Sequence, residues 1–201
     1  FNQGSNGAGK DGGAGNPTTE DGKYVTSYFW ENVLQKDKLL DILQKFISYE
    51  RSEKKKIMPD GSTKTTVSSK VIFPRYHQLT AVWQVLAHAK TNGVGNKYLI
   101  QHSAGSGKSK SIAWLAHQLH GLFDSKGENH LFDSVIVITD RIVLDKQLSE
   151  DIKQFAPMRG IVEHITSDGG SKTSKLKDAL ANRKKVIVCT VQTFPFLLDE
   201  M

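Results

Sequence analysis

The sequence predicts an α/β fold in which helices flank a parallel β-sheet. Two observations support this. Beyond residue 98, short apolar stretches typical of buried strands alternate with longer amphipathic stretches typical of helices. Strands separated by helices require crossover connections, and these make neighbouring strands parallel. The first strand-like stretch also runs into a glycine-rich loop that opens into a helical pattern, which is the arrangement of a phosphate-binding loop.

Residues 1–22 are predicted to be a linker, or a loop that orders only against a partner. They contain seven of the 17 glycines and, after Phe1, no apolar side chain larger than Pro17. Such a segment cannot bury enough surface to offset the entropy lost on ordering. Because the chain starts so abruptly, we expect it to be a fragment of a longer protein.

Residues 23–72 are predicted to form a helical connector and a basic β-hairpin. Residues 24–49 are expected to be helical, with Trp30-Glu31 in a short first turn and Asp37 able to cap the start of the main helix. Its apolar stripe comprises Leu39, Leu40, Ile42, Leu43, Phe46 and Ile47. The hairpin is expected over residues 53–72, with its turn at 59–61.

Residues 73–201 are predicted to form the nucleotide-binding lobe. A helix is expected from about His77 to Lys90, on the stripe Leu79, Val82, Trp83, Leu86 and Ala89. The elements that follow are strand 98–101, helix 108–123, strand 135–139, helix 142–155, strand 161–166, helix 173–182 and strand 186–190. The helix after the loop is expected to bury Ile112, Leu115, Ala116, Leu119, Leu122 and Phe123.

The loop itself carries the chemistry. Gly105 and Gly107 can adopt backbone angles closed to other residues, so successive N–H groups can turn inward around a phosphate chain. Lys108 brings a mobile positive charge to the outer phosphates, and the Ser109 hydroxyl can ligate Mg²⁺. Lys108 and Ser109 are therefore the candidate catalytic residues. The expected phosphate contacts come from Ala104, Gly105, Ser106, Gly107, Lys108 and Ser109. The alternative is a glycine turn that only begins a helix, with a solvated lysine.

Gln78 is a candidate for recognising adenine. It ends the stretch Phe-Pro-Arg-Tyr-His-Gln at residues 73–78, and its amide can donate to and accept from adenine as a matched pair. If it does so, ATP is preferred over GTP. The alternative is a surface glutamine at the start of a helix.

Two acidic positions are candidates for holding a metal. Asp140 lies at the end of a strand-like stretch that starts with four apolar residues, 135–138, so it could be the Mg²⁺ ligand of a generic P-loop enzyme. Thr139 and Arg141 beside it favour a DNA-contacting element. Asp199-Glu200 comes too soon after Thr193 for a strand to precede it, and we interpret it as an exposed helix end.

The charge distribution indicates a polyanionic partner. The net charge is +6, and two stretches, 45–75 and 172–185, carry the basic excess. Such clusters suit DNA phosphates rather than bases, although a solvated face remains the alternative for each.

The sequence disfavours a membrane-spanning protein, a disulfide-bonded protein and a zinc-binding protein. No apolar run is long enough to span a membrane. The single cysteine, Cys189, lies in a strand-like stretch and is expected to be a buried thiol, which suits the cytoplasm. His117 and His120 are spaced like metal ligands, but no third ligand is near them, and polar helix positions explain both.

These motifs resemble those of superfamily-two helicases and translocases. The matching elements are the aromatic/Arg–Gln stretch, the phosphate loop, Thr139-Asp140-Arg141 with Leu144 and Gln147, and Thr190-Val191-Gln192-Thr193. The closer similarity is to the R subunit of type I restriction enzymes, which covers essentially the whole chain. It rests on the stretches FPRYHQ, YLIQHSAGSGKS, SIAWLAHQL, FDSVIVITDR and VLDKQL.

This resemblance implies the first RecA-like lobe of an ATP-driven motor that pumps double-stranded DNA. The parent would be a site-specific deoxyribonuclease with DNA-dependent ATPase activity, acting with methylation and specificity subunits. Gln78 and Arg75 would contact adenine, and Arg141, Thr190 and Gln192 would contact the DNA backbone or couple to it. The nuclease residues and the acidic motif II would lie outside this chain, so the fragment alone would be inactive. A small P-loop kinase or GTPase using Asp140 and a non-hydrolysing ATP-binding module remain as alternatives.

Overall fold

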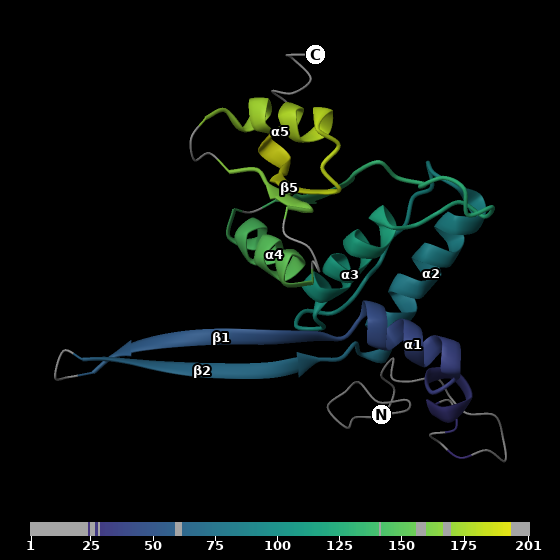
Figure 1. The fold of residues 1–201 in the computed structure, drawn as a ribbon, viewed down its shortest axis with the longest axis horizontal. Helices are drawn as coiled ribbons and strands as arrows, with labels where there is room; N and C mark the ends of the chain where they lie inside the picture. The colour runs from purple at the N-terminus through teal and green to yellow at the C-terminus, as the bar shows by residue number, and fades with distance from the viewer. Residues whose placement is uncertain are drawn as a thin grey trace. The chain divides into compact units, whose positions relative to one another are not determined.

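The computed structural model describes residues 24, 27, 29–58, 62–140, 142–155, 160–166 and 170–193 (Figure 1). The chain divides into two compact units, Phe1–His77 and Gln78–Met201. No helix in the described part of the chain is long and apolar enough to cross a membrane.

The first unit contains a short helical turn, a helix and a hairpin. These are η1 (Phe29–Val33), α1 (Lys36–Lys45), β1 (Ser48–Ile57) and β2 (Thr63–Ile72). The turn expected around Trp30 and Glu31 falls within η1, and the main helix starts close to Asp37 as expected, but α1 ends at Lys45 rather than at Tyr49. The residue at the N-cap of α1 is Gln35, while Asp37 lies in the first turn, where its charge favours the helix dipole.

The end of α1 explains why the helix is shorter than the sequence predicts. The Phe46 and Ile47 backbone N–H groups both donate to the Ile42 carbonyl, and β1 begins at the next residue. Ile42 and Phe46 are fully buried, whereas Leu40 and Leu43 are about half exposed. Only part of the predicted stripe therefore packs.

The hairpin is longer than expected because β1 begins at Ser48. Its antiparallel register runs from Ser48 opposite Ile72 to Ile57 opposite Thr63. The predicted turn at 59–61 lies outside the described residues. Close to it, the Met58 N–H donates to the Ser62 carbonyl at 2.8 Å.

The second unit is the predicted α/β layer structure. It comprises α2 (Tyr76–Asn92, whose first two residues belong to the first unit), α3 (Lys108–His120), β3 (Val135–Thr139), α4 (Ile142–Phe155), β4 (Val162–His164), α5 (Lys172–Ala181), β5 (Val186–Thr190) and η2 (Val191–Thr193). The described strands of this unit form a parallel sheet of order β3-β5-β4. The parallel sheet flanked by helices confirms the predicted fold class.

The core lies on both faces of the central strand β5, all five residues of which are buried. Val186 and Val188 pack with residues of α3 and α4, while Ile187 and Cys189 pack under α5. Figure 1 shows α4 and α5 on opposite sides of β5. Cys189 is a buried free thiol, as predicted.

The predicted strand 98–101 is wrong. Residues 96–103 have no regular secondary structure, Leu99 is 92% exposed, and the central strand is β5 rather than the stretch ending at Gln101. The Tyr98 hydroxyl lies 2.9 Å from His88 Nδ1, and the two rings meet edge to face. Tyr98 is therefore held against α2 and not in the sheet.

The buried face of α3 also differs from the predicted one. Ala116 is buried as expected, and Ala113 and Trp114, which lie outside the predicted stripe, are buried as well. Ile112 is 39% exposed, and Phe123 lies beyond the helix end and is exposed. The small side chains of Ala113 and Ala116 pack in the same core cluster as residues of α4 and the sheet, and this packing decides which face of α3 is buried.

Candidate functional site

The glycine loop has the backbone that the sequence predicts for phosphate binding. Gly105 and Gly107 have φ of +73° and +84°, which glycine adopts without strain. Gly107 is the N-cap of α3, and its carbonyl accepts from the N–H groups of Lys110 and Ser111 at 3.1 and 3.4 Å. The loop therefore ends where the positive pole of a 13-residue helix begins.

Lys108 and Ser109 occupy the first turn of α3. The Lys108 ammonium donates to the carbonyls of His102 and Ser103 at 3.2 and 2.8 Å, so it reaches back over the start of the loop. The side chain is exposed, and these contacts can be exchanged for phosphate oxygens. Ser109 is half-buried beside it.

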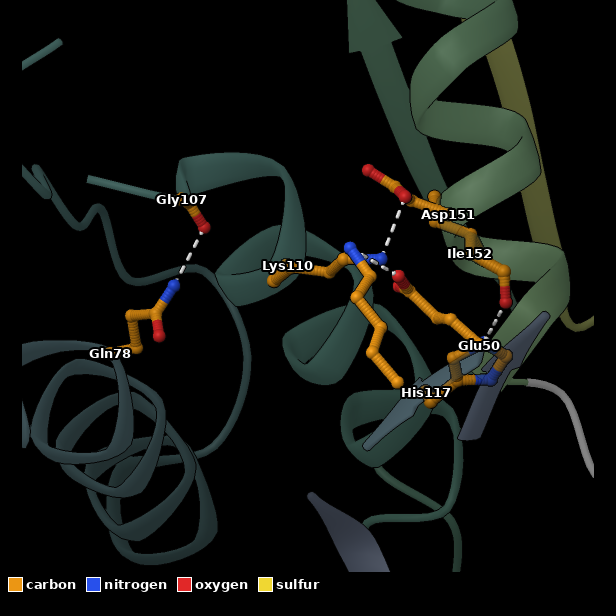
Figure 2. A network of polar contacts seen from close by, with 8 residues as sticks. Glu50, Gln78, Gly107, Lys110, His117, Asp151 and Ile152 are labelled. Atoms are coloured by element: carbon orange, nitrogen blue, oxygen red, sulfur yellow. Dashed lines mark hydrogen bonds and ion pairs between the residues drawn. The ribbon is translucent and has the colours of Figure 1, made fainter. Parts of the chain in front are cut away.

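Gln78 comes from the first turn of α2 and faces the loop. It is only 4% exposed, and its Nε2 donates to the carbonyls of Gly107 at 2.8 Å and Ser106 at 3.3 Å. Figure 2 shows the Gln78 amide directed at the Gly107 carbonyl. Arg75 is exposed and belongs to the other unit, so it is not placed relative to the loop.

Two of the three candidate DNA-contacting residues, Thr190 and Gln192, lie at the carboxyl edge of the parallel sheet. There β3 and β5 end side by side, with Thr139 opposite Thr190. Gln192 Nε2 donates to the Asp140 carbonyl at 3.2 Å, which joins two segments 52 positions apart. Asp140 and Gln192 are exposed. Arg141 lies outside the described residues.

Thr190 is buried, unlike Asp140 and Gln192 at the same edge of the sheet. It is 1% exposed, and its hydroxyl lies 3.3 Å from that of the buried Thr193. This pair closes the turn after β5. Of the two roles that the resemblance implies for Thr190, a buried side chain suits coupling rather than direct contact with DNA.

Polar contacts that the sequence does not reveal join α3 to α4 (Figure 2). Lys110 Nζ lies 2.8 Å from Asp151 Oδ1, with the two side chains 17% and 18% exposed. His117 Nε2 lies 2.6 Å from the Ile152 carbonyl, which can only accept, so Nε2 carries the proton. These residues are 35 to 41 positions apart, and only the hydrophobic packing of α3 on α4 brings them together.

Burial favours the neutral form of both histidines on α3, His117 and His120. Desolvation lowers the pKa of His117 below 6.5, partly opposed by the hydrogen bond to Ile152. Desolvation likewise lowers the pKa of His120. Within the described ranges, no group of three His, Cys, Asp or Glu side chains could hold a metal ion. Burial therefore favours the neutral form of His117, whose Nε2 links α3 to α4.

Comparison with protein families matches residues 77–200 to the SWI2/SNF2 ATPase family. The match covers more than half of the chain and includes the loop, Gln78 and the carboxyl edge of the sheet. No curated protein and no solved structure matches the chain.

Proposed function

Because the chain belongs to the SWI2/SNF2 ATPase family, we propose that it is the ATP-binding lobe of a motor that moves double-stranded DNA. The observation that carries the proposal is the loop of residues 104–109 at the start of α3, with its two left-handed glycines. ATPases of this family generally act on DNA, which supports DNA as the polymer along which the motor moves.

The nucleotide would be held by the loop of residues 104–109. Its backbone N–H groups and the α3 dipole favour an anion, and Lys108 would exchange its carbonyl partners for phosphate oxygens. The Ser109 hydroxyl would hold Mg²⁺, which neutralises charge on the phosphates. Gln78 and Arg75 are the residues proposed to meet adenine, and Gln78 lies directly against the loop.

The DNA side would be the carboxyl edge of the sheet. Arg141 and Gln192 are proposed to contact the phosphate backbone, with buried Thr190 coupling β5 to that turn. The Gln192–Asp140 hydrogen bond supports a shared surface, because a shift of one segment moves the other. The basic stretches 45–75 and 172–185 would add contacts that do not depend on sequence.

We further propose that the parent protein is the R subunit of a type I restriction enzyme, a cytoplasmic deoxyribonuclease that works with methylation and specificity subunits. The sequence similarity at FPRYHQ, YLIQHSAGSGKS and FDSVIVITDR supports this assignment. The test is ATP hydrolysis by the parent with those subunits present. We expect stimulation by unmethylated duplex that carries the recognition sequence, and equal stimulation by any duplex without the subunits would contradict the restriction assignment.

The motor proposal is tested separately by nucleotide binding to the 201-residue chain. Isothermal titration calorimetry with MgATP should show binding that Lys108→Ala strongly weakens. Absence of binding by the unaltered chain would overturn the assignment of the loop.

A further inference from the structure

The Gln78 side chain is a buried amide whose two donor hydrogens both have acceptors on the loop. Its Nε2 lies 2.8 Å from the Gly107 carbonyl and 3.3 Å from the Ser106 carbonyl. A primary amide nitrogen carries two hydrogens, so each carbonyl can take one. Adenine and the loop would therefore compete for the same donor group.

The Gly107 carbonyl is the point at which the loop becomes helix. It accepts from the backbone N–H groups of Lys110 and Ser111 and from the Gln78 amide. A donor arriving from α2 thus fixes the orientation of the peptide that precedes Lys108. The direction of the following N–H groups, which a phosphate would meet, depends on that peptide.

The space at Gly107 shows how closely Gln78 fits. A Cβ atom at position 107 would lie 2.5 Å from Gln78 Nε2 and 3.6 Å from its Cδ, whereas a Cβ at Gly105 would meet nothing within 4 Å. Both glycines have positive φ, so both disfavour a side chain for backbone reasons. Only at Gly107 would an added Cβ also displace the Gln78 amide.

We propose that Gln78 is a positioning residue that holds the loop of residues 104–109 in its phosphate-binding conformation, whatever base the nucleotide carries. This rests on the proposed binding of nucleotide by the loop. A residue that only reads adenine affects ATP alone, whereas one that positions the loop affects every ligand with a triphosphate.

The first experiment measures affinity for a ligand without a base. Magnesium tripolyphosphate, MgATP and MgGTP are titrated into the chain and its variants Gln78→Ala and Gln78→Glu. The carboxylate of Gln78→Glu keeps the shape of the amide but only accepts, so it opposes the two loop carbonyls. The control is Gln84→Glu, an exposed position on the same helix.

We expect both Gln78 variants to weaken tripolyphosphate binding at least about tenfold, because this is the change in affinity that corresponds to losing one buried hydrogen bond. Gln84→Glu should leave the affinity unchanged. Unchanged tripolyphosphate affinity with reduced ATP affinity would overturn the proposal and leave Gln78 as a reader of adenine.

The second experiment needs no ligand, so it separates this inference from the proposed function. Amide hydrogen exchange over residues 104–109 should be faster in Gln78→Glu than in the unaltered chain, while exchange in β5 stays the same. If the unaltered chain binds neither nucleotide nor tripolyphosphate, the proposed function fails and the inference that rests on it falls too. Unchanged loop exchange overturns the positioning role alone.

The third experiment compares the melting temperatures of Gly105→Ala and Gly107→Ala, each with and without Gln78→Ala. Gly107→Ala should lower the melting temperature more than Gly105→Ala in the unaltered chain, because it also displaces Gln78. In the Gln78→Ala background the difference between the two glycine variants should become smaller. An undiminished difference in that background contradicts the contact.

Discussion

Lys108 is the single side chain on which we expect nucleotide affinity to depend most. Its ammonium donates to two carbonyls at the exposed start of the loop, so the fold gains little from it. Lys108→Ala should weaken MgATP binding by roughly 10- to 100-fold, the usual range for losing a charged hydrogen bond, with an unchanged melting temperature. Calorimetry and thermal unfolding check both parts. Lys126→Ala, an exposed lysine in another loop, is the control and should change neither.

His117 makes stability depend on pH. Burial lowers its pKa below 6.5, so the folded chain disfavours the protonated ring more than the unfolded chain does. The contribution of neutral His117 to the free energy of unfolding is therefore fully present above pH 6.5 and is lost as the pH falls through the lowered pKa. Melting temperatures recorded from about pH 7.5 to 5.5 should fall less in His117→Gln than in the unaltered chain. Because burial lowers the pKa of His120 in the same direction, His120→Gln is measured in parallel.

Between elements, the Lys110–Asp151 pair joins the helix that follows the nucleotide loop to the helix that follows the Asp140 turn. Partial burial reduces solvent screening of this pair. A double-mutant cycle with Lys110→Met and Asp151→Asn should give a coupling free energy of about 1 kcal/mol in denaturant unfolding. The more exposed Lys45–Asp41 pair within α1 serves as the comparison, for which about 0.4 kcal/mol is expected. Equal coupling for both pairs would remove any special role for the α3–α4 contact.

The hairpin is the element that we expect to contact DNA outside the family match, which begins at residue 77. Towards its base the charges are paired, Glu50 with Lys70 at 2.9 Å and Arg51 with Glu53 at 3.4 Å. Towards its tip the sequence has lysines at 54–56 and 64, and positions 56 and 64 are directly opposite in the register. Like charges opposite each other destabilise a ribbon unless an anion meets them.

Reversing the charge of Lys54, Lys55 and Lys56 to Glu should therefore weaken duplex binding equally for all DNA sequences. The slope of log affinity against log salt should become shallower by about 0.9 for each phosphate that the variant no longer neutralises. Fluorescence anisotropy over a series of salt concentrations measures both quantities. Reversal of Lys36, Lys97 and Lys126, three exposed lysines outside the tip, is the control of equal charge. If the two triple variants behave alike, the hairpin lysines are only a solvated face.

For the whole molecule, we expect nucleotide binding with negligible turnover. Phosphoryl transfer also needs an acid that holds the metal and a group that positions water, and the 201 residues include no Asp-Glu-x-His motif. Phosphate release from the chain with Mg²⁺, ATP and duplex DNA should stay at background. Robust turnover that Asp140→Asn abolishes would make Asp140 the metal-holding acid and would refute the restriction-motor assignment.

The sequence by itself determined the features that depend on local chemistry. Glycine at positions 105 and 107 permits the positive φ that the loop adopts there. The bounds of β3, α4 and β5 follow from the spacing of apolar residues along each segment. The parallel sheet follows from the alternation of strands and helices.

Only the tertiary structure decided which surfaces meet. Tyr98 contacts α2 instead of entering a sheet, α3 buries Ala113 and Trp114 instead of Ile112, and Gln78 donates to a carbonyl 29 positions away. An apolar stretch such as 98–101 becomes a strand only if a neighbouring edge pairs with it, and a helix buries whichever face fits its partner. Both conditions depend on residues distant in the chain, which local patterns do not specify.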